Sequence, residues 1–586
     1  MADAAANTDD LALVRGIPLD EEPGLGALTT PGFLREVVER YPSREALVQP
    51  FPDGSRQAWT YAELWDRSVA VARALLACGV GKDSRVGILM TNRLEWASSV
   101  FGIGLAGGTA VGLSTFSTPA ELEYLIQASG VSIVLFEGRI LAKDFAAILT
   151  EIEPAIAAAA PGALASTKFP FLRRLVMVDD AAAGADMTGG AVESWDAFLA
   201  HGAHIAPELV DATAAAVHPS DPCLLFFSSG STGKPKGILN AHRGVCIQSW
   251  RWVRMYGFDE AHPVRTWSAN GLFWSGNFSI SLGATLAAGG TLVLQPTFVP
   301  AETVPILERE RVSLPYCWPH QWVQLESAPG WAEADLSALH YFDRAMNLKQ
   351  PQPSISTTWT EPRASYGSTE TFTISTGFPV DAPADLIAGC NGGVLPGNTV
   401  KIVDPETGAT LKRGETGEIA VKGPTLMLGY IGVPNDEALD EAGFYRAGDG
   451  GYLDERGRLV FQGRINDIVK TGGANVSPVE VDWALASCPG IKVCKTTGVP
   501  HEALGEMVVT LVARQEGQML TEADVIGFLK TRLASYKVPR KVIFVSEEDL
   551  NLTGTAKIKP AEARALAQRK MKAEIGMPYL RRLMRG

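Results

Sequence analysis

The sequence predicts an α/β protein: a large N-terminal domain of doubly wound, mostly parallel sheets with a small β-barrel-like subdomain, and then a small α+β domain. Three observations lead to this prediction. Helical and strand-like patterns alternate through the first two thirds of the 586 residues, which is typical of parallel sheets with helices on both faces. Short strands joined by turn dipeptides follow from about Asn398. A second alternation of helices and strands begins after Arg464.

The first elements follow a leader. Acidic residues stand where a secretory signal would carry Lys or Arg, so such a signal is not predicted. We expect residues 1–28 to be a flexible leader. Residues 59–80 have the apolar spacing of a helix that ends at Gly79. The next segments are predicted as strand, helix, strand, helix and strand, in the order 84–90, 95–108, 109–114, 121–129 and 131–137, with a turn at Thr118–Pro119 before the second helix. Residues 144–166 are Ala-rich and helical at best, and 179–190 form a surface loop.

One apolar stretch has to be tested as a membrane span. No Asp, Glu, Lys or Arg occurs between Thr266 and Ala301. A spanning helix needs about 20 apolar residues, so this stretch is long enough. It contains Asn270, Pro296 and several glycines, however, and it breaks at the sequences GAT and GGT. We therefore predict a buried helix, a turn and a buried strand at 291–295 instead of a transmembrane segment.

The C-terminal part has its own pattern. Helix, strand, helix and strand are predicted, in this order, at 476–488, 508–515, 522–533 and 541–547. The last residues, 559–586, contain eight Lys or Arg and two Glu, which predicts a basic surface helix. The sequence leaves open whether this tail makes a peripheral membrane contact. It also leaves open whether the protein is a monomer or a homodimer.

The composition excludes several classes of function. With 52 Lys and Arg against 65 Asp and Glu, the net charge is −13, whereas broad nucleic-acid binding needs a basic face. The chain has seven Cys residues, an odd number with no CxxC pair. That is too few for a disulfide scaffold and favours a reducing, cytoplasmic location.

The densest motif is CLLFFSSGSTGKPKG at 223–237. Glycines let a backbone close around a phosphate, amides and hydroxyls donate hydrogen bonds to it, and a lysine adds positive charge. The spacing differs from the GxxxxGK[ST] of a Walker A loop, and Pro235 stands where a helix would continue. We predict a phosphate-binding loop that contains Ser228, Ser229, Gly230, Ser231, Thr232, Gly233 and Lys236.

This loop and five later motifs resemble the adenylate-forming superfamily, which includes acyl-CoA synthetases, aryl-CoA ligases and luciferases. The later motifs follow in the family's order: YGSTE (366–370), GEIAVKGPTLMLGY (417–430), GFYRAGDGGYLDERGRLVFQGR (443–464), VKTGGANVSPVEVD (469–482) and LTGTAKIKP (552–560). The resemblance covers roughly residues 30–560. It implies an AMP-forming acyl-CoA synthetase that uses ATP, Mg²⁺ and coenzyme A.

The resemblance implies a two-step reaction and a matching domain plan. A carboxylate attacks the α-phosphate of ATP to give acyl-AMP and pyrophosphate, and a thiol then displaces AMP. The AMP-binding domain is expected at 29–463, with its β-rich subdomain at about 380–463. A mobile lid domain with the basic tail is expected at 468–586. The hinge between them is expected at 464–467, with Asn466 where the family commonly has Asp or Lys.

The resemblance also assigns residues to the phosphates and the metal. Thr232, Lys236 and the loop amides would hold the β- and γ-phosphates. Thr369, which follows Gly367 and Ser368 in YGSTE, would contact the α-phosphate. Glu370 would hold Mg²⁺, a hard cation that prefers oxygen ligands. The resemblance thus implies a catalytic set of Lys557, Thr232 and Glu370.

Further residues are assigned to the nucleoside and to the second step. Tyr366 would stack on adenine. Asp449 and Arg464 would bind the ribose, although Ala447 replaces the Thr that usually stands two places before the Asp. Lys557 would bridge the carboxylate and the α-phosphate, and the glycine that usually precedes it is replaced by Ala556. The loop of Gly472 and Gly473 would line the tunnel for the pantetheine arm of coenzyme A.

The acid pocket is expected around GLFWSGNFS at 271–279. Amino-acid-activating relatives place an Asp near this point, and its absence would leave a substrate ammonium group buried without a partner. Aromatic residues in this region favour a hydrophobic carboxylic acid that is fatty, aryl or cyclic. The predicted pocket residues are Trp267, Phe273, Trp274, Gly276, Arg344 and Ala345. Arg344 either narrows the pocket, meets a polar group of the acid or pairs with Asp343.

Two other functions are weighed against a CoA ligase. An acyl-AMP ligase that passes the acyl group to a carrier-protein thiol or to an amine shares the first half-reaction, so the sequence separates it poorly. A non-catalytic nucleotide-binding scaffold is disfavoured because it would need no reactive lysine. Neither a zinc site nor a GxSxG nucleophile motif is predicted.

Overall fold

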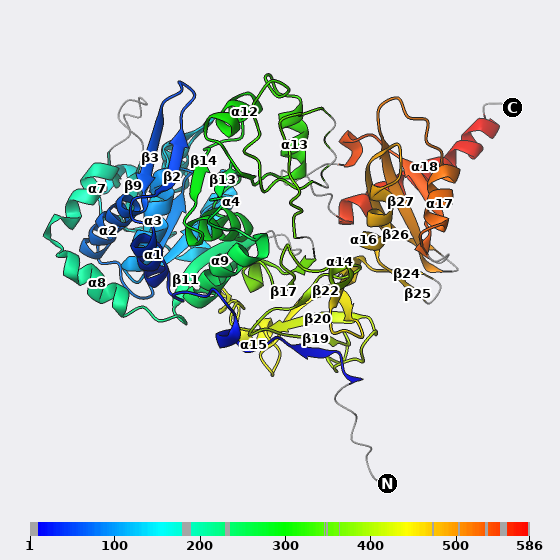
Figure 1. Ribbon diagram of the computed structural model, residues 1–586, viewed down its shortest axis with the longest axis horizontal. Helices are drawn as coiled ribbons and strands as arrows, with labels where there is room; N and C mark the ends of the chain where they lie inside the picture. The colour runs from blue at the N-terminus through cyan, green and yellow to red at the C-terminus, as the bar shows by residue number, and fades with distance from the viewer. Residues whose placement is uncertain are drawn as a thin grey trace, which may run out of the picture. The chain divides into compact units, whose positions relative to one another are not determined.

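The computed structural model describes residues 10–178, 189–228, 235–344, 346, 348, 350–362, 364–471, 474–501, 504–533, 537–550 and 560–583. The chain divides into two compact units (Figure 1). The larger comprises Arg15–Thr399 and Val421–Tyr445, and the smaller comprises Met1–Val14, Val400–Ala420 and Arg446–Gly586. This division assigns parts of the predicted β-rich subdomain to each unit. The hinge at 464–467 stays a prediction.

An eight-stranded sheet forms one half of the larger unit. Its strand order is β10 (Val192–Ser194), β9 (Arg174–Met177), β6 (Ile133–Phe136), β4 (Arg85–Leu89), β5 (Thr109–Gly112), β11 (Pro222–Ser228), β12 (Lys236–Ala241) and β21 (Gly429–Tyr430). The first six strands run parallel and the last two pair antiparallel. The strand predictions at 84–90, 109–114 and 131–137 are confirmed.

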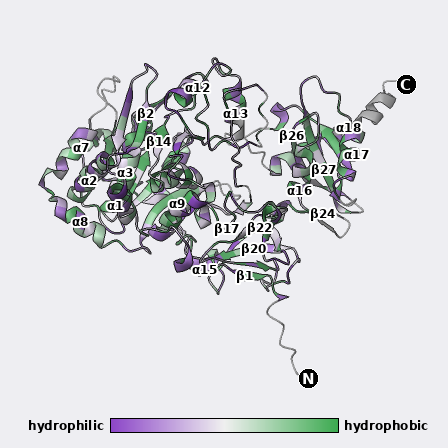
Figure 2. Cartoon of the chain, viewed as in Figure 1, coloured by the Kyte–Doolittle hydropathy of each residue, from purple (hydrophilic) through white to green (hydrophobic). Residues whose placement is uncertain are grey.

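Helices cover both faces of this sheet. Successive residues of a strand point to opposite faces, so each strand contributes to two buried clusters. Ile133 and Leu135 join one buried cluster, while Val134 and Phe136 join another. The first cluster includes residues of α1 (Thr30–Arg40), α2 (Tyr61–Ala77), α3 (Leu94–Leu105) and α9 (His242–Tyr256). The second includes residues of α4 (Pro119–Ser129), α5 (Phe145–Ile152) and α6 (Ala155–Ala158). Green, hydrophobic segments lie in the interior of the larger unit in Figure 2.

A five-stranded sheet forms the other half of the larger unit. Its order is β15 (Leu314–Pro315), β13 (Arg265–Ser268), β14 (Thr291–Leu294), β2 (Glu45–Pro50) and β3 (Arg56–Thr60). Only the β2–β3 pair is antiparallel. Leu47 and Leu292 face the helices shared with the first sheet, whereas Val48 and Val293 face α12 (Pro300–Arg309) and α13 (Pro319–Glu326). The larger unit is therefore layered helix, sheet, helix, sheet, helix.

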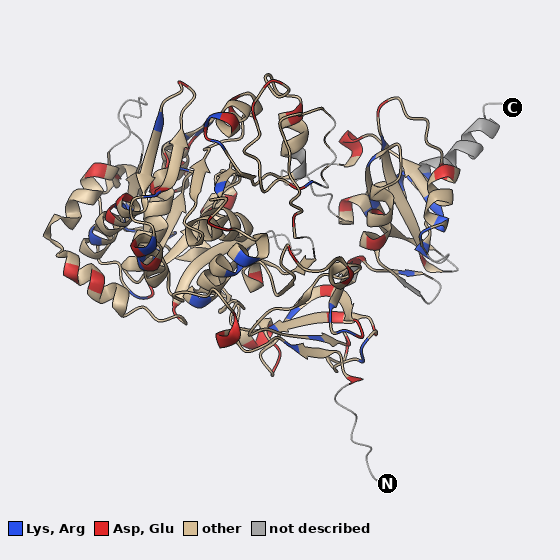
Figure 3. Cartoon of the chain, viewed as in Figure 1, with Lys and Arg blue, Asp and Glu red and all other residues tan. Residues whose placement is uncertain are grey.

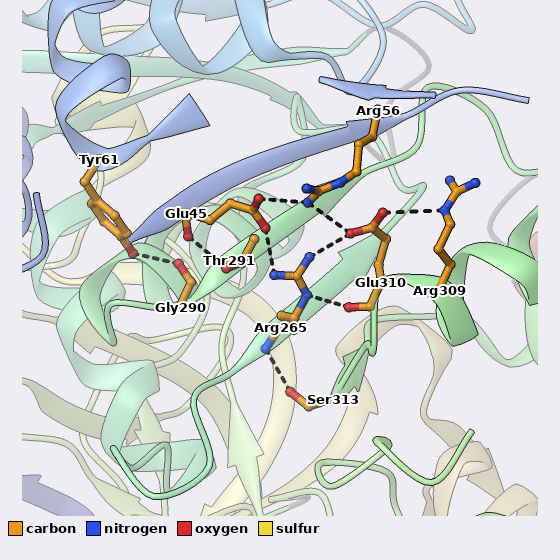
Figure 4. A network of polar contacts seen from close by, with 9 residues as sticks. All are labelled: Glu45, Arg56, Tyr61, Arg265, Gly290, Thr291, Arg309, Glu310 and Ser313. Atoms are coloured by element: carbon orange, nitrogen blue, oxygen red, sulfur yellow. Dashed lines mark hydrogen bonds and ion pairs between the residues drawn. The ribbon is translucent and has the colours of Figure 1, made fainter. Parts of the chain in front are cut away.

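Charged side chains meet at the amino ends of this sheet (Figure 4). Arg265 begins β13 and donates to Glu45 Oε1 at 2.8 Å and to Glu310 Oε2 at 2.7 Å. Arg56 donates to Glu45 at 2.8 Å and to Glu310 at 3.2 Å. The network joins the starts of β2 and β13 to the end of α12. Elsewhere in the larger unit, most strand residues of the sheets are uncharged (Figure 3).

The apolar stretch forms a buried helix followed by β14, as predicted. The helix is composed of α10 (Ser275–Asn277), the π-helical segment η5 (Phe278–Ala284) and α11 (Thr285–Ala287). The π-helical turn was not predicted. Among the described residues, no helix combines the length and the apolar character that a membrane crossing requires.

The smaller unit contains most of an open sheet and a compact α+β module. The sheet order is β1 (Leu13–Arg15), β19 (Thr399–Val403), β20 (Gly417–Lys422), β22 (Tyr445–Leu453) and β23 (Leu459–Arg464). The described strands do not close on themselves, so the expected barrel-like closure is corrected to an open sheet. In sheets, closure depends on pairing of the two edge strands, which local patterns do not encode.

The α+β module confirms the C-terminal element predictions. Its strands are β24 (Val469–Thr471), β25 (Ala474–Val476), β26 (Ile491–His501), β27 (Gly505–Arg514) and β28 (Lys541–Phe544). Its helices are α16 (Pro478–Ala486), α17 (Glu522–Lys530) and α18 (Pro560–Leu583). The basic tail is helical as predicted, and Ala563, Leu566 and Ala567 on its first turns are buried against residues of β26 and β27.

Candidate active site

The predicted phosphate loop connects two paired strands. Ser228 ends β11 and lies opposite Lys236, which begins β12. Lys236 is exposed, and its Nζ lies 5.0 Å from the ring centroid of Tyr430. Five predicted loop residues lie outside the described part of the chain: Ser229, Gly230, Ser231, Thr232 and Gly233. The loop therefore leaves the sheet where β11 ends, at the carboxyl edge on which α/β proteins bind their ligands.

The YGSTE motif is a tight turn. Tyr366 ends β16 (Ser365–Tyr366) and is 8% exposed. A Cβ at Gly367 would lie 1.8 Å from the carbonyl oxygen of Thr373, so only glycine fits there. Phe372 and Thr373 have φ angles of 46° and 96°. Two successive non-glycine residues with positive φ indicate a strained turn, and such strain persists where surrounding structure enforces it.

The hydroxyl groups of this turn are organised locally. The backbone N–H of Ser368 donates to Thr371 Oγ1 at 3.0 Å, and Thr369 begins a short 3₁₀ turn. Thr369 Oγ1 lies 3.5 Å from Ser275 Oγ, at the start of α10. The residue predicted to touch the α-phosphate therefore lies beside the segment predicted to hold the acid.

Two tyrosines that the sequence analysis missed organise Glu370. Tyr430 Oη donates to Glu370 Oε1 at 2.8 Å, and Tyr445 Oη lies 3.2 Å from Tyr430 Oη. Burial and the nearby Glu370 carboxylate raise the pKa of Tyr445, so this phenol stays protonated and can donate. The carboxylate is half-buried and retains oxygen lone pairs beyond the one that Tyr430 uses. An oxygen donor of this kind fits Mg²⁺.

The predicted ribose residues form a pair in the smaller unit. Asp449 on β22 lies opposite Arg464 on β23, and Arg464 Nε is 3.0 Å from Asp449 Oδ1. The Asp449 side chain is 7% exposed and the Arg464 side chain 60%. Arg464 also donates to the carbonyl of Ala447 at 2.8 Å, a contact that needs no threonine side chain at that position.

The predicted acid pocket residues fall into separate places. Phe273 and Trp274 meet edge to face with their ring centroids 4.9 Å apart, and Phe116 stacks on Trp274 at 5.9 Å with an angle of 13°. A Cβ at Gly276 would lie 3.8 Å from Tyr316 Oη. Trp267 is fully buried on the α12–α13 side of the five-stranded sheet, where its Nε1 donates to Gln295. Core packing accounts for the position of Trp267.

A neutral network holds the segment that carries Phe273 and Trp274. Asn92 donates to the carbonyls of Ser268 and Asn270 and accepts from the backbone N–H of Leu272 at 3.1 Å. Asn277 donates to the Asn270 carbonyl and accepts from the hydroxyls of Ser268 at 2.8 Å and Ser281 at 2.7 Å. These side chains are at most 5% exposed. Buried, satisfied polar networks hold one arrangement of the backbone.

The remaining predicted residues are placed as follows. Arg344 is exposed, and its backbone N–H donates to the Trp359 carbonyl at 3.0 Å. Asn466 lies in the 3₁₀ turn Ile465–Asp467. Four predicted residues lie outside the described part of the chain: Ala345, Gly472, Gly473 and Lys557.

Two profiles of known enzyme domains match this chain. The profile described as AMP-binding enzyme matches residues 34–431, and the profile of the AMP-binding enzyme C-terminal domain matches residues 480–557. The chain belongs to the AMP-binding enzyme family. The predicted membership of the adenylate-forming superfamily is confirmed, and so is the predicted class, an AMP-forming acid–CoA ligase that uses ATP and coenzyme A.

Relatives in this family match nearly the whole chain. The medium-chain acyl-CoA ligase ACSF2, mitochondrial, of Danio rerio is 28% identical over 541 residues, which cover 90% of this chain and 87% of that protein. A feruloyl-CoA synthase of Amycolatopsis sp is 29% identical over 549 residues, 89% of this chain and 98% of that protein. The crystal structure of the anthranilate CoA ligase AuaEII with anthranoyl-AMP has a TM-score of 0.70 at 23% identity, covering 94% of this chain and 99% of that one. The AMP-binding fold predicted from the sequence is thereby confirmed.

Proposed function

We propose that this AMP-binding enzyme activates a bulky apolar carboxylic acid, fatty, aryl or cyclic, and transfers the acyl group to coenzyme A. The observation that carries the proposal is the aromatic pair of Phe273 and Trp274. It lies in a stretch of chain without any Asp, Glu, Lys or Arg, from Thr266 to Ala301. Apolar contacts would hold the acyl group there, and no fixed charge of that stretch would select an amino group.

The relatives support this class of acid. The names of two relatives refer to a medium-chain acyl group and to a feruloyl group. Both groups are larger than acetate. In the proposed pocket, the half-buried ring of Trp274, which packs on the buried Phe273, would offer each of them apolar surface, and burial of apolar area is the main source of affinity for such groups.

We propose the following residue roles for the first step. Glu370, oriented by Tyr430, would hold Mg²⁺, and Thr369 would contact the α-phosphate beside the acid. Lys236 and the residues of the loop would bind the outer phosphates. Lys557 would bridge the carboxylate and the α-phosphate by resemblance to the family, so that it stabilises the negative charge that develops between them.

We also propose roles for residues that act on the nucleoside and on the second step. Tyr366 would stack on adenine, and the Asp449 carboxylate, with Arg464, would bind the ribose hydroxyls. Gly472 and Gly473 would line the pantetheine tunnel. The lid would turn at 464–467, with Asn466 as the hinge residue. The domain bounds proposed with this hinge are 29–463 and 468–586.

A cytoplasmic location is part of the proposal. Its support is that all seven cysteines are free thiols, and that three of them, Cys223, Cys246 and Cys488, are buried. Burial raises the pKa of the Cys223 thiol to about 12. Such thiols behave as small apolar side chains and are typical of a reducing compartment.

The experiment is pyrophosphate release from Mg-ATP with a panel of acids, with and without coenzyme A. The panel contains butyrate, octanoate, benzoate, cinnamate, cyclohexanecarboxylate and a free amino acid. We expect acid-dependent release that increases with coenzyme A, the strongest response with one of the bulky acids, and an acyl-CoA product by mass spectrometry. Release that is unaffected by coenzyme A while acyl-AMP accumulates would contradict the assignment as a CoA ligase.

A lysine variant controls for the source of the signal. Two unit charges about 4 Å apart at an effective dielectric near 20 interact by about 4 kcal/mol. Lys557→Ala should therefore lose on the order of 10² to 10³ in adenylation. It should still form the thioester from acyl-AMP supplied ready-made. Equal loss in both half-reactions would show that Lys557 has been given the wrong role.

A further inference from the structure

The loop between β5 and α4, residues 113–118, lies at the same edge of the sheet as the phosphate loop. β5 and β11 are parallel neighbours, with Leu224 opposite Ala110 and Leu225 opposite Val111. The chain therefore leaves both strands side by side, at their carboxyl ends. α4 is also tied to the far end of the phosphate loop, because Tyr124 Oη donates to the carbonyl of Pro235 at 3.1 Å. No predicted site residue comes from this loop.

The tip of this loop presents an aromatic ring. Phe116 is 68% exposed, whereas Thr115 and Ser117 on either side are each 8% exposed. The ring of Phe116 stacks on Trp274 and meets Phe273 edge to face at 6.0 Å. Single exposed apolar residues are common on protein surfaces and need no function. Here the ring rests on two residues of the proposed acid pocket, beside the Ser275–Thr369 contact.

A half-buried lysine, Lys143, holds this loop in place. Lys143 belongs to β8 (Lys143–Asp144), which pairs with β7 (Arg139–Ile140). Its Nζ donates to the carbonyl of Thr115 at 3.0 Å and to the carbonyl of Ser117 at 2.8 Å. These two carbonyls flank Phe116. A single ammonium group thus anchors the backbone on both sides of the exposed ring.

We propose that Phe116 is a specificity-determining residue: its ring is the outer wall of the acid pocket and packs on the apolar part of the acid. Lys143 is the positioning residue that keeps the ring over Trp274. The inference rests on the proposed function, because it supposes that the acid lies against Phe273 and Trp274. The exposed face of Phe116 is the surface that a bulky acid would cover and a short acid would leave uncovered.

The test measures acyl-CoA formation by wild type and Phe116→Ala with two acids. These are the bulky acid with the highest kcat/KM in the panel and butyrate. Loss of a large apolar contact should lower kcat/KM for the bulky acid about tenfold, chiefly through its KM. For butyrate the change should stay below about twofold, and the KM values for ATP and coenzyme A should also change by less than about twofold. Phe171→Ala is the matched control, since Phe171 is a 63% exposed phenylalanine that precedes β9.

The role of Lys143 is tested by a double-mutant cycle. Lys143→Met should lower kcat/KM for the bulky acid about threefold. In the Phe116→Ala background it should lower this kcat/KM by less than about 1.5-fold further, because Lys143 acts through the ring of Phe116. Lys143→Arg, which retains hydrogen-bond donors, should restore most of the loss. Thermal unfolding of each variant separates this effect from loss of folding.

Three results would decide against the inference. Unchanged selectivity between the two acids in Phe116→Ala would overturn it. A rise confined to the KM for coenzyme A would assign Phe116 to the thiol substrate instead. Additive effects of the two substitutions would remove Lys143 as its positioning residue. Failure of the proposed function is distinguishable from these, since wild type would then respond most strongly to butyrate or to the free amino acid, or to no acid of the panel.

Discussion

The two ends of the five-stranded sheet are held by opposite chemistry. At the amino ends, Arg265 is bound between the carboxylates of Glu45 and Glu310. At the carboxyl ends, the side chains of Asn92 and Asn277 donate to the Asn270 carbonyl, and Asn277 accepts from the hydroxyl group of Ser268, which ends β13. Both networks fix strand ends in buried or half-buried positions. One does so with ions and the other with neutral groups.

This difference in charge matches the proposed position of the acid, at the carboxyl ends of the strands. A carboxylate at the carboxyl ends would repel an anionic substrate, and a cation there would hold it away from the α-phosphate. Neutral amides order the loop before Trp274 without either effect. At the amino ends no substrate is proposed, so the ion pairs affect stability alone. Charged groups therefore lie where they stabilise packing, and they are absent from the segment proposed to select the acid.

The largest expected effect comes from placing a charge in the neutral network. Asn277→Asp removes the donor to the Asn270 carbonyl and buries a carboxylate beside it. We expect kcat/KM for the acid to fall on the order of 10²-fold and the unfolding free energy to fall by about 2–4 kcal/mol. Because a protonated carboxyl is neutral and can donate, both losses should shrink as the pH is lowered. Steady-state kinetics and urea unfolding between pH 5 and 8 measure this.

A matched control for that variant lies at the other end of the sheet. Glu45→Gln removes a charge from the ionic network by an equally small change of shape. Its kcat/KM should remain within about twofold of wild type. Glu45 contacts Arg56 and Arg265 at the amino ends of the strands, whereas the acid segment follows the carboxyl end of β13. An equal loss of activity in both variants would mean that the neutral end has no special relation to catalysis.

Titration of His242 is the next largest effect and belongs to neither network. Burial lowers the pKa of this imidazole to about 4, and the Thr30 N–H donates to its Nδ1. Between about pH 6.5 and pH 4 the unfolded chain binds a proton that the native protein does not. The unfolding free energy should therefore fall as the pH drops through this range, by up to about 3 kcal/mol. His242→Gln, which keeps an acceptor for Thr30, should lack this slope in urea unfolding.

The ionic end should respond in stability and not in activity. Arg265→Met leaves Glu310, whose side chain is 4% exposed, with Arg56 and Arg309 as its remaining cations. We expect a loss of about 2 kcal/mol in unfolding free energy, less than for a fully buried pair because partners remain. Arg35→Met breaks an exposed pair with Asp211 and should cost below about 0.5 kcal/mol. A kcat/KM reduced more than fivefold in Arg265→Met would show that the ionic end also affects catalysis.

The smallest effect concerns the metal side of the site. Tyr430→Phe removes the hydrogen bond to Glu370 and keeps the ring beneath Lys236. Loss of one hydrogen bond to a carboxylate corresponds to about 1–2 kcal/mol, so we expect a decrease of roughly fivefold to twentyfold in kcat. The Mg²⁺ concentration for half-maximal rate should rise, while the KM for the acid stays unchanged. An acid KM that rises instead would place Tyr430 in the acid pocket.

Local patterns predicted most of the fold. The alternation of apolar residues located the strands of the eight-stranded sheet, and the two motifs drew attention to Ser228, which ends β11, and to Glu370, which lies in the 3₁₀ turn Thr369–Thr371. The resemblance supplied roles that no spacing could give. The sequence did not predict the π-helical turn at Phe278–Ala284, because its cause lies in contacts with other elements.

The missed site residues share one property. Phe116, Tyr430 and Asn92 each act across more than 50 positions of the chain, on Trp274, Glu370 and Asn270 respectively. A lone phenylalanine, tyrosine or asparagine has no local signature for such a contact. Only the tyrosine lay within a motif already recognised, GEIAVKGPTLMLGY, so its position in a site was open to prediction although its partner was not.

The most direct test of a neutral, aromatic acid site is a competition experiment. Wild-type protein is given Mg-ATP, coenzyme A and an equimolar mixture of octanoate, cinnamate, cyclohexanecarboxylate, butyrate and phenylalanine, and all CoA thioesters are quantified by mass spectrometry. We predict that one or more of the three bulky apolar acids gives nearly all of the thioester, with butyrate minor and phenylalanine absent. Phenylalanyl or butyryl thioester as the main product would contradict the proposed pocket.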